Sequence, residues 1–261
     1  AGAGFEPKTL FDLFPDDDKD CPTLKTPVAK DDLFWLTGEN KSIKVPSWLM
    51  PKSLHNKGNY IISLGELCQW ISEKAMELGV DIFPGFPAQS YLKDESGRVI
   101  GISTGDMGID KEGNQKGTYT PGMDILAKQT IFAEGARGHL GKQLIREFNL
   151  DEGKTPQHFA IGFKEVWEVD NDNHSPGDVV HTMGWPLNEG TTGGGFLYHF
   201  DNKRVAVGLI VDLNYTNPSH SPFQEFQQFK KHPKIKQFLD SGKRVSYGAR
   251  AITKGGINSL V

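Results

Sequence analysis

The sequence predicts a mixed α/β protein in two parts, with an α/β first half followed by an antiparallel sheet. Three observations predict this fold class. Residues 59–83 read as strand, helix and strand; residues 129–148 read as a strand, a Gly-rich turn and a helix; and strand-like segments follow one another from 159 to 213 without a helix between them. Strands that alternate with helices are typical of α/β folds, whereas successive strands joined by turns are typical of antiparallel sheets.

The composition excludes several classes of protein. The 261 residues include 29 Lys and Arg against 33 Asp and Glu, a net charge of -4, which argues against a nucleic-acid partner. No apolar stretch approaches the roughly 20 residues that a membrane-spanning helix needs. The two cysteines, Cys21 and Cys68, form no CxxC or Cys/His spacing, so we expect no metal site within this chain. No nucleophile motif is present either, and we predict no catalytic residue.

The first fifty residues predict a short helix and an apolar hairpin. Residues 5–14 carry apolar side chains at near-helical spacing, and the apolar clusters 33–36 and 45–50 flank a polar link. Two interpretations of Trp35 and Trp48 in this hairpin are open. Their rings pack on the parent domain, or they enter a membrane interface, where Trp is enriched and neighbouring Lys side chains meet lipid headgroups.

Residues 59–83 predict a strand, a capped helix and a second strand. Ser63 and Glu66 have the spacing of a capping box, in which the hydroxyl accepts from the amide three residues later. A helix is expected over 64–78, and a strand over 80–83. A unit of this size implies a right-handed crossover and a parallel pair of strands.

The next region predicts a hairpin and then a Gly-rich turn. Strand signals flank a turn at 94–97, and a strand at 129–133 leads into Gly135 and Gly138 before a helix at 139–148. Glycines let the backbone approach a ligand, and the free amides at the start of that helix would favour a phosphate, as in dinucleotide sites. A plain tight turn is the alternative.

The second half predicts an antiparallel sheet with a helix that starts at Ser221-Pro222. Gly193, Gly194 and Gly195 precede one of its strands. A planar ligand such as a quinone could lie flat there and bond to main-chain groups, and a bulge or turn is the alternative. Tyr198 and His199 are neighbours in sequence, so they point to opposite faces of the strand and we expect no cooperation between them.

Several long stretches of the sequence resemble one family, electron transfer flavoprotein–ubiquinone oxidoreductase. The similarity runs in order through nearly the whole chain. It is carried by the segments HNKGNYIISLGELCQWISEKAMELGV (55–80), STGDMGIDKEGN (103–114), LAKQTIFAEGARGHLGKQLI (126–145), GWPL (184–187), GGGFLYHF (193–200), NPSHSPFQEFQQFKKHP (217–233) and SGKRVSYGARA (241–251).

The resemblance implies the fold and the activity. It implies a glutathione-reductase-like FAD-binding domain with an inserted antiparallel-sheet ubiquinone-binding domain. It also implies an electron-transferring-flavoprotein dehydrogenase with FAD and a [4Fe-4S] cluster, which takes electrons from reduced electron transfer flavoprotein, in fatty acid and amino acid oxidation, and passes them to ubiquinone. The expected location is the surface of the mitochondrial inner membrane, or of the cytoplasmic membrane in a prokaryote.

The resemblance also assigns site residues. Gly193 and Gly194 are implied to contact the quinone through their backbone, although this sequence departs from many relatives at Thr192 and Gly195. Glu134, Gly135 and Gly138 are implied neighbours of FAD. The hairpin residues implied to contact the membrane are Leu33, Phe34, Trp35, Leu36, Trp48, Leu49 and Met50.

The same resemblance divides the chain into expected domains. These are parts of the FAD domain at 1–32 and 56–155, the membrane hairpin at 33–55, the ubiquinone-binding domain at 156–253 and a return to the FAD domain at 254–261. The N-terminal dinucleotide fingerprint and the cluster cysteines of the family are absent from these residues, so we expect an internal fragment that is inactive alone. Two alternatives remain open: another FAD-dependent oxidoreductase of this fold, such as a hydroxylase or isoprenoid reductase, and a non-enzymatic peripheral membrane module.

Overall fold

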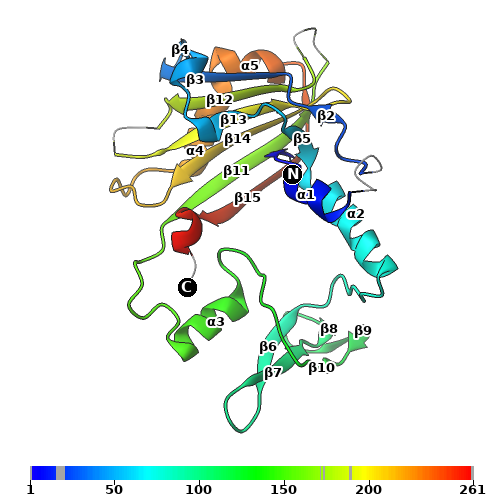
Figure 1. Cartoon of the computed structure of the whole chain (residues 1–261). Coiled ribbons are helices and arrows are strands. Elements are labelled where there is room, and N and C mark those ends of the chain that lie inside the picture. Colours follow the sequence, from blue (N-terminus) through cyan, green and yellow to red (C-terminus); the bar gives the residue numbers. More distant parts are fainter. Residues whose placement is uncertain (1, 16–20, 171, 173, 188–189, 260–261) are drawn as a thin grey trace. The chain divides into compact units, whose positions relative to one another are not determined.

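The computed structural model describes all residues except 1, 16–20, 171, 173, 188–189 and 260–261, and it divides into two compact units (Figure 1). The first unit comprises residues 1–80 and 158–255, and the second comprises residues 81–157 and 256–261. Each unit is described by itself.

A seven-stranded sheet forms the centre of the first unit, in the order β15-β11-β14-β13-β12-β3-β4. Its strands are β3 (Lys30–Gly38), β4 (Lys41–Val45), β11 (Phe159–Glu168), β12 (Asp178–Gly184), β13 (Gly193–His199), β14 (Arg204–Asp212) and β15 (Lys243–Thr253). All neighbours are antiparallel except β3 and β12, which run parallel with Trp35 opposite Met183. The hairpin β3–β4 therefore belongs to the same sheet as the strands of the second half.

One face of this sheet packs against the helices α4 (Pro222–Lys231) and α5 (Pro233–Leu239). Phe226, Phe229 and Ile235 from the helices are buried in one cluster with Leu36, Leu197 and other sheet residues. Gly195 is required here, because a Cβ at this position would lie 2.3 Å from the Phe229 ring. The predicted helix from Pro222 and the antiparallel sheet are confirmed.

The first unit also contains a small sheet in the order β1-β5-β2, built from Gly2–Phe5, Tyr60–Ser63 and Thr26–Pro27. The helices α1 (Lys8–Leu13) and α2 (Leu64–Glu77) share a buried cluster with this sheet, and two 3-10 turns, η2 (Ser47–Leu49) and η3 (Lys52–Leu54), precede β5 in the chain. The predicted cap of α2 is confirmed, since Ser63 Oγ accepts from the Glu66 amide at 3.4 Å.

The predicted parallel strand–helix–strand unit is wrong. β5 pairs antiparallel with β1 and β2, and residues 80–83 form no strand. Val80 and Phe83 are exposed in the chain described here, so this segment has no neighbouring strand to complete a ladder.

The second unit contains a sheet of β10 (Asp124–Leu126), β7 (Val99–Thr104) and β6 (Ala88–Lys93), a hairpin of β8 (Met107–Ile109) and β9 (Gln115–Thr120), and α3 (His139–Phe148). The short helix η4 (Gly256–Ser259) is assigned to the same unit. The helix predicted over 139–148 is confirmed, and the strand predicted over 129–133 is wrong, because Ile131 and its neighbours pair with no strand.

Candidate functional site

The second face of the large sheet, opposite α4 and α5, is rich in glycine. Across four strands the register places Phe196, Gly208, Lys164 and Gly248 in one row, and Gly194, Ile210, Gly162 and Arg250 in the next. We call this surface the glycine-rich face. Since glycines add no side chain to the pleat, the neighbouring side chains stand above a flat floor.

A cavity of about 530 Å³ lies on the glycine-rich face. Phe196 is folded over Gly208, where a Cβ would lie 2.3 Å from its ring, and the Lys164 amine lies 5.4 Å from the centre of the same ring. Burial lowers the pKa of Lys164 from its usual value. Arg250 and Ile210 also line the cavity. A flat floor, an aromatic ring and two basic groups suit a planar ligand with polar oxygen atoms.

Gly193 and Gly194 begin β13 at the edge of this floor. The β13–β14 ladder starts at Gly193, whereas the β12–β13 ladder runs only from Gly195 to Tyr198. The N–H and C=O of Gly193 face β12 and therefore lie beyond that ladder, whereas those of Gly194 face Ile210 on β14. Gly193 has φ 153°, and a Cβ there would lie 2.0 Å from the Ile210 carbonyl oxygen, so only glycine fits. The structure thus gives packing reasons for glycine and also leaves peptide groups without a ladder partner.

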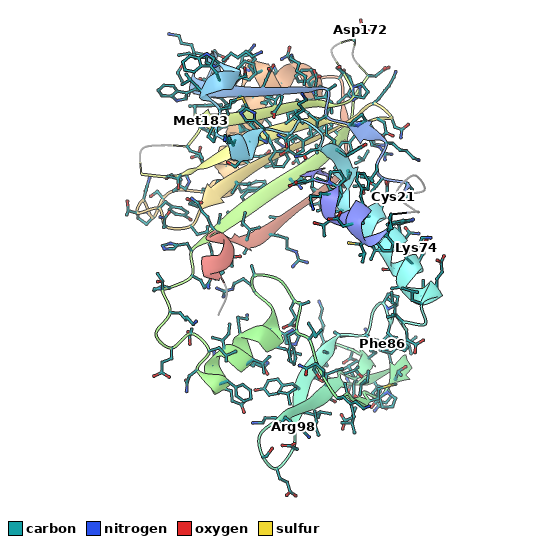
Figure 2. The ribbon with its side chains drawn as sticks, in the orientation of Figure 1. Cys21, Lys74, Phe86, Arg98, Asp172 and Met183 are labelled. Carbon is teal, nitrogen blue, oxygen red and sulfur yellow. The ribbon has the colours of Figure 1, made fainter. Side chains whose placement is uncertain are left out.

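An exposed apolar row leads across the sheet toward Gly194. Ile43 on β4, Trp35 on β3 and Met183 on β12 are direct cross-strand neighbours on the glycine-rich face (Figure 2 labels Met183). They are 57%, 52% and 47% exposed, respectively. Because Thr182 pairs with Gly195, Met183 stands beside Gly194 on the next strand. Sequence reasoning missed Ile43 and Met183, since their alignment with Trp35 depends on strand pairing.

The predicted membrane residues differ in their exposure. Trp35, Trp48 and Leu49 are exposed, whereas Leu33, Leu36 and Met50 are buried. Leu36 belongs to the core under the helices, and Phe34 packs against the same core with Lys234 Nζ 4.9 Å from the centre of its ring. The alternation of a strand explains why Trp35 is exposed and Leu36 is buried, because adjacent residues on a strand face opposite sides.

The structure also corrects the prediction of free amides at the start of α3. The Glu134 carboxylate accepts from the Gly141 amide at 2.7 Å and from the Leu140 amide at 3.4 Å. It takes the place of a capping side chain, because the N-cap residue is Gly138. A Cβ at Gly138 would lie 2.3 Å from Glu134 Cβ, so this glycine lets Glu134 reach the helix. A phosphate does not fit at these two amides.

Three polar side chains meet on the glycine-rich face beside the apolar row. His181 Nε2 lies 3.0 Å from Tyr198 Oη, and His181 Nδ1 lies 3.6 Å from Asp31 Oδ1. Tyr198 and His199 do point to opposite faces as predicted, and the partner of Tyr198 is instead His181 on the neighbouring strand. Sequence reasoning missed this group because Asp31, His181 and Tyr198 come from three strands far apart in the chain.

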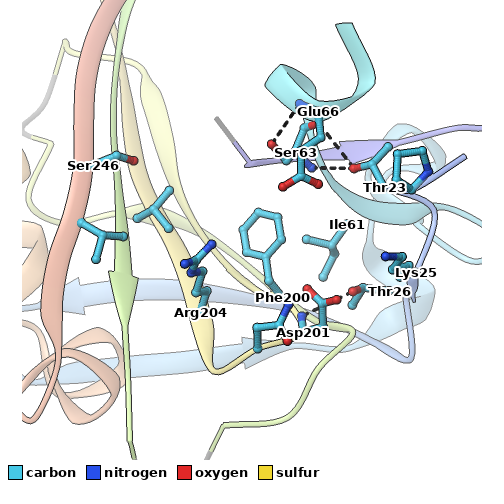
Figure 3. A pocket seen from close by; sticks show the side chains of 14 residues that line it. Thr23, Lys25, Thr26, Ile61, Ser63, Glu66, Phe200, Asp201, Arg204 and Ser246 are labelled. Carbon is cyan, nitrogen blue, oxygen red and sulfur yellow. Dashed lines mark hydrogen bonds between the residues drawn. The ribbon is translucent and has the colours of Figure 1, made fainter. Parts of the chain in front are cut away.

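A second cavity of about 560 Å³ lies where the small sheet and α2 approach the β13–β14 turn (Figure 3). Three of its polar side chains are paired: Thr23 Oγ1 accepts from the Ser63 amide, Thr26 Oγ1 accepts from the Asp201 amide, and Arg204 donates to Glu168. Its lining also includes Lys25, Glu66 and Asp201, whereas the cavity on the glycine-rich face is lined mainly by apolar residues and glycine.

Comparison with known proteins gives a family match for the second half of the chain. Residues 159–252 match the family model described as ETF-QO, ubiquinone-binding. This range contains Gly193, Gly194 and every residue of the cavity on the glycine-rich face.

The relatives extend the similarity to the whole chain. Electron transfer flavoprotein–ubiquinone oxidoreductase of Pseudomonas aeruginosa is 58% identical over all of this chain and 47% of its own length. The mitochondrial human protein of the same name is 46% identical over all of this chain and 42% of its own length. The chain thus spans about half the length of the curated relatives it matches.

The solved structures show the fold. A geranylgeranyl bacteriochlorophyll reductase-like protein of Thermoplasma acidophilum has a TM-score of 0.64 at 16% identity, covering 97% of this chain and 55% of its own. The flavin-dependent brominase Bmp2 has a TM-score of 0.55 at 13% identity, covering 94% of this chain and 55% of its own. The chain therefore has the mixed α/β and antiparallel-sheet fold of FAD-dependent oxidoreductases. The relatives and the family model confirm the predicted resemblance to electron transfer flavoprotein–ubiquinone oxidoreductases, including their ubiquinone-binding domain.

Proposed function

We propose that this chain is the quinone-binding part of a membrane-associated flavoprotein that passes electrons from reduced electron transfer flavoprotein to ubiquinone. The observation that carries the proposal is the position of Gly193 and Gly194. They lie inside the segment that matches the ubiquinone-binding model, next to a flat cavity, and at the end of an exposed apolar row.

The quinone headgroup lies flat against Gly194 and bonds to the peptide groups of Gly193 that lie beyond the β12–β13 ladder. A carbonyl oxygen of the quinone needs a donor, and a main-chain amide provides one without a bulky side chain. The isoprenoid tail follows Met183 and Trp35 along the apolar row. This places the polar end of the ligand on the backbone and the apolar end on exposed side chains, as its solubility in lipid requires.

The apolar row, together with Trp48 and Leu49, rests in the interface of a membrane. Trp is favoured at this depth, and Lys41 and Lys52 stand near these residues in the chain, where they can meet lipid headgroups. Within the described residues no helix is long and apolar enough to cross a membrane. Attachment by a surface patch is consistent with the mitochondrial inner membrane in eukaryotes or the cytoplasmic membrane in a prokaryote.

The cofactors are FAD and a [4Fe-4S] cluster of the longer protein. The flat cavity on the glycine-rich face suits the planar flavin ring of FAD. Lys164 and Arg250, which line this cavity, would stabilise negative charge on that ring. The start of α3 does not suit the FAD phosphates, since Glu134 occupies it, so we assign Gly135 and Gly138 only as backbone neighbours of the cofactor. Cys21 is buried and Cys68 is exposed, and among the described residues no three potential ligands come together as a metal site.

The test is oxidation of reduced electron transfer flavoprotein by a ubiquinone analogue with the full-length protein. Gly194→Ala adds a Cβ that would lie 2.8 Å from the Thr182 carbonyl oxygen, beside the proposed headgroup. We expect quinone reduction to fall at least tenfold while the flavin content is unchanged. Gly117→Ala is the control, because a Cβ there meets nothing within 4 Å. A flavin-loaded full-length protein that does not reduce the quinone would refute the proposal.

A further inference from the structure

The inference concerns protons and rests on the proposed function. Reduction of a quinone to a quinol takes up two electrons and two protons. The backbone of Gly193 and Gly194 can hold the quinone, but an amide is not an acid at neutral pH. A proton donor is therefore expected within reach of the headgroup, on the glycine-rich face.

Asp31, His181 and Tyr198 form a connected chain of acid–base groups on this face. Tyr198 Oη lies 3.0 Å from His181 Nε2, and Asp31 Oδ1 lies 3.6 Å from His181 Nδ1. Within the described part of the chain, Nδ1 and Oδ1 are both buried and make no hydrogen bond. The negative charge of the Asp31 carboxylate can therefore offset the positive charge of a proton on the Nδ1 side of the His181 ring. We call these three residues the relay.

The carboxylate at the far end of the relay is held ionised. Asp31 Oδ2 accepts from the amide of Asn56 at 2.9 Å and from its side chain at 3.0 Å. Burial alone would raise the pKa of Asp31, but the nearby His181 and the hydrogen bonds from Asn56 outweigh it and bring the pKa below its usual value. The ionised Asp31 carboxylate lies beside His181 Nδ1, so the relay ends on a negative charge.

The relay lies close to the proposed headgroup. His181 pairs directly with Phe196 across β12 and β13, and Gly194 is two residues from Phe196 on the same face. Diagonal neighbours of this kind in an antiparallel sheet are about 7–8 Å apart at the backbone. Tyr198 is four residues from Gly194 on β13, about 13 Å at the backbone, and its hydroxyl lies 3.0 Å from His181, which pairs with Phe196, the residue between Tyr198 and Gly194 on this face.

The chemistry of Tyr198 defines its role. Burial, and then the charge of Asp31, raises the pKa of Tyr198 to about 12. A phenol with this pKa does not release its proton alone at neutral pH. It can pass one on if a stronger acid replaces the proton in the same step, and His181 Nε2 is in hydrogen-bond distance to do so.

We propose that the relay delivers a proton to the quinone. The Tyr198 O–H bond breaks as the quinone O–H bond forms, the imidazolium Nε2–H of His181 reprotonates Tyr198, and His181 is left neutral. The FAD of the longer protein would supply the two electrons, and water would supply the second proton. His181 then takes up a proton from solvent, since it is partly exposed. Tyr198 touches the quinone, and Asp31 is a positioning residue.

The experiment uses the full-length protein with Tyr198→Phe, His181→Asn and the double variant. Tyr198→Phe keeps the ring and removes the hydroxyl, and His181→Asn removes the imidazole. General acid catalysis contributes roughly 10²–10⁴-fold, and we expect each single variant to reduce the quinone at least 30-fold more slowly. Because the two groups act in series, the double variant should be no more than threefold slower than the slower single variant.

Two further measurements separate proton delivery from a structural role. Equilibrium binding of the quinone analogue, followed by protein fluorescence, should change less than threefold in the single variants. Added imidazole should restore part of the rate to His181→Ala. His220→Ala is the matched control, because His220 Nδ1 also lies 3.6 Å from a carboxylate, that of Glu225. His220 differs in its place, since it precedes α4 and contacts Tyr215, which packs on the helix-covered core. Imidazole should have no effect on it.

The outcomes are distinct. If the unmodified protein does not reduce the quinone, the proposed function fails. If it does, and either single variant keeps its rate within threefold, the relay is wrong. Multiplicative losses in the double variant, or losses that match a loss of quinone binding, also overturn it.

Discussion

Trp35 and Met183 lie directly opposite each other on the parallel strands β3 and β12, although 148 residues separate them in sequence (183 − 35). Both are about half exposed, and with Ile43 they form a continuous apolar row on one face of the sheet. This pairing joins the predicted membrane hairpin to the strand beside Gly194.

The first prediction concerns this row. A Trp that loses about 100 Å² of exposed surface to lipid contributes roughly 2.5 kcal/mol, or a factor of about 60 in binding. Trp35→Ser and Met183→Ser should each weaken binding of the full-length protein to liposomes by at least tenfold, measured by co-sedimentation. Phe223→Ser is the control, because Phe223 is as exposed as Trp35 but lies on α4. Equal losses in all three variants would argue against a specific patch.

The second prediction concerns Glu134 as the cap of α3. Its carboxylate satisfies the Leu140 and Gly141 amides, so Glu134→Ala should lower the free energy of unfolding by about 1 kcal/mol. Hydrogen–deuterium exchange should quicken at those two amides first. Glu152→Ala, an exposed residue after the helix, should leave both quantities unchanged. Unaltered exchange in Glu134→Ala would show that the cap contributes nothing.

The third prediction concerns a buried carboxylate under the sheet. Glu165 accepts from Lys230 Nζ at 2.9 Å, Arg244 Nη1 at 3.1 Å and Trp167 Nε1 at 2.8 Å. Glu165→Ala leaves the mostly buried Lys230 without its carboxylate, and we expect a loss of about 3 kcal/mol in chemical denaturation. Glu168→Ala breaks a half-exposed pair on the same strand and should cost less than about 1 kcal/mol. Similar costs for the two would contradict this account.

The fourth prediction concerns pH. Burial, and then the charges of His174 and Lys30, lowers the pKa of His199 from 6.5 to about 4. As the pH falls, the unfolded chain therefore takes up a proton on His199 before the folded chain does. The stability that depends on neutral His199 is fully present above pH 6.5 and is lost as the pH falls toward 4. The loss amounts to roughly 3 kcal/mol. His199→Gln should flatten the stability profile between pH 7 and pH 4, and a profile as steep as that of the unmodified protein would refute the assignment.

The local elements could be predicted from the sequence. The apolar periodicity and the Ser63 cap predict α2, and the same reasoning predicts α3 and the helix from Pro222. Residues within one turn or one strand set these features, so a short stretch of sequence contains the information. The wrong strands at 80–83 and 129–133 show the limit, because a strand also needs a neighbour.

The sequence by itself determined the type of protein, through long matching segments, and the glycines at which the quinone is proposed to bind. Only the tertiary structure decided that β3 pairs with β12, that Leu36 and Trp35 face opposite sides, and that Asp31, His181 and Tyr198 meet. The physical reason is that side-chain alternation assigns residues to two faces but does not say which face is covered. Contacts between distant strands decide that, and local patterns do not encode them.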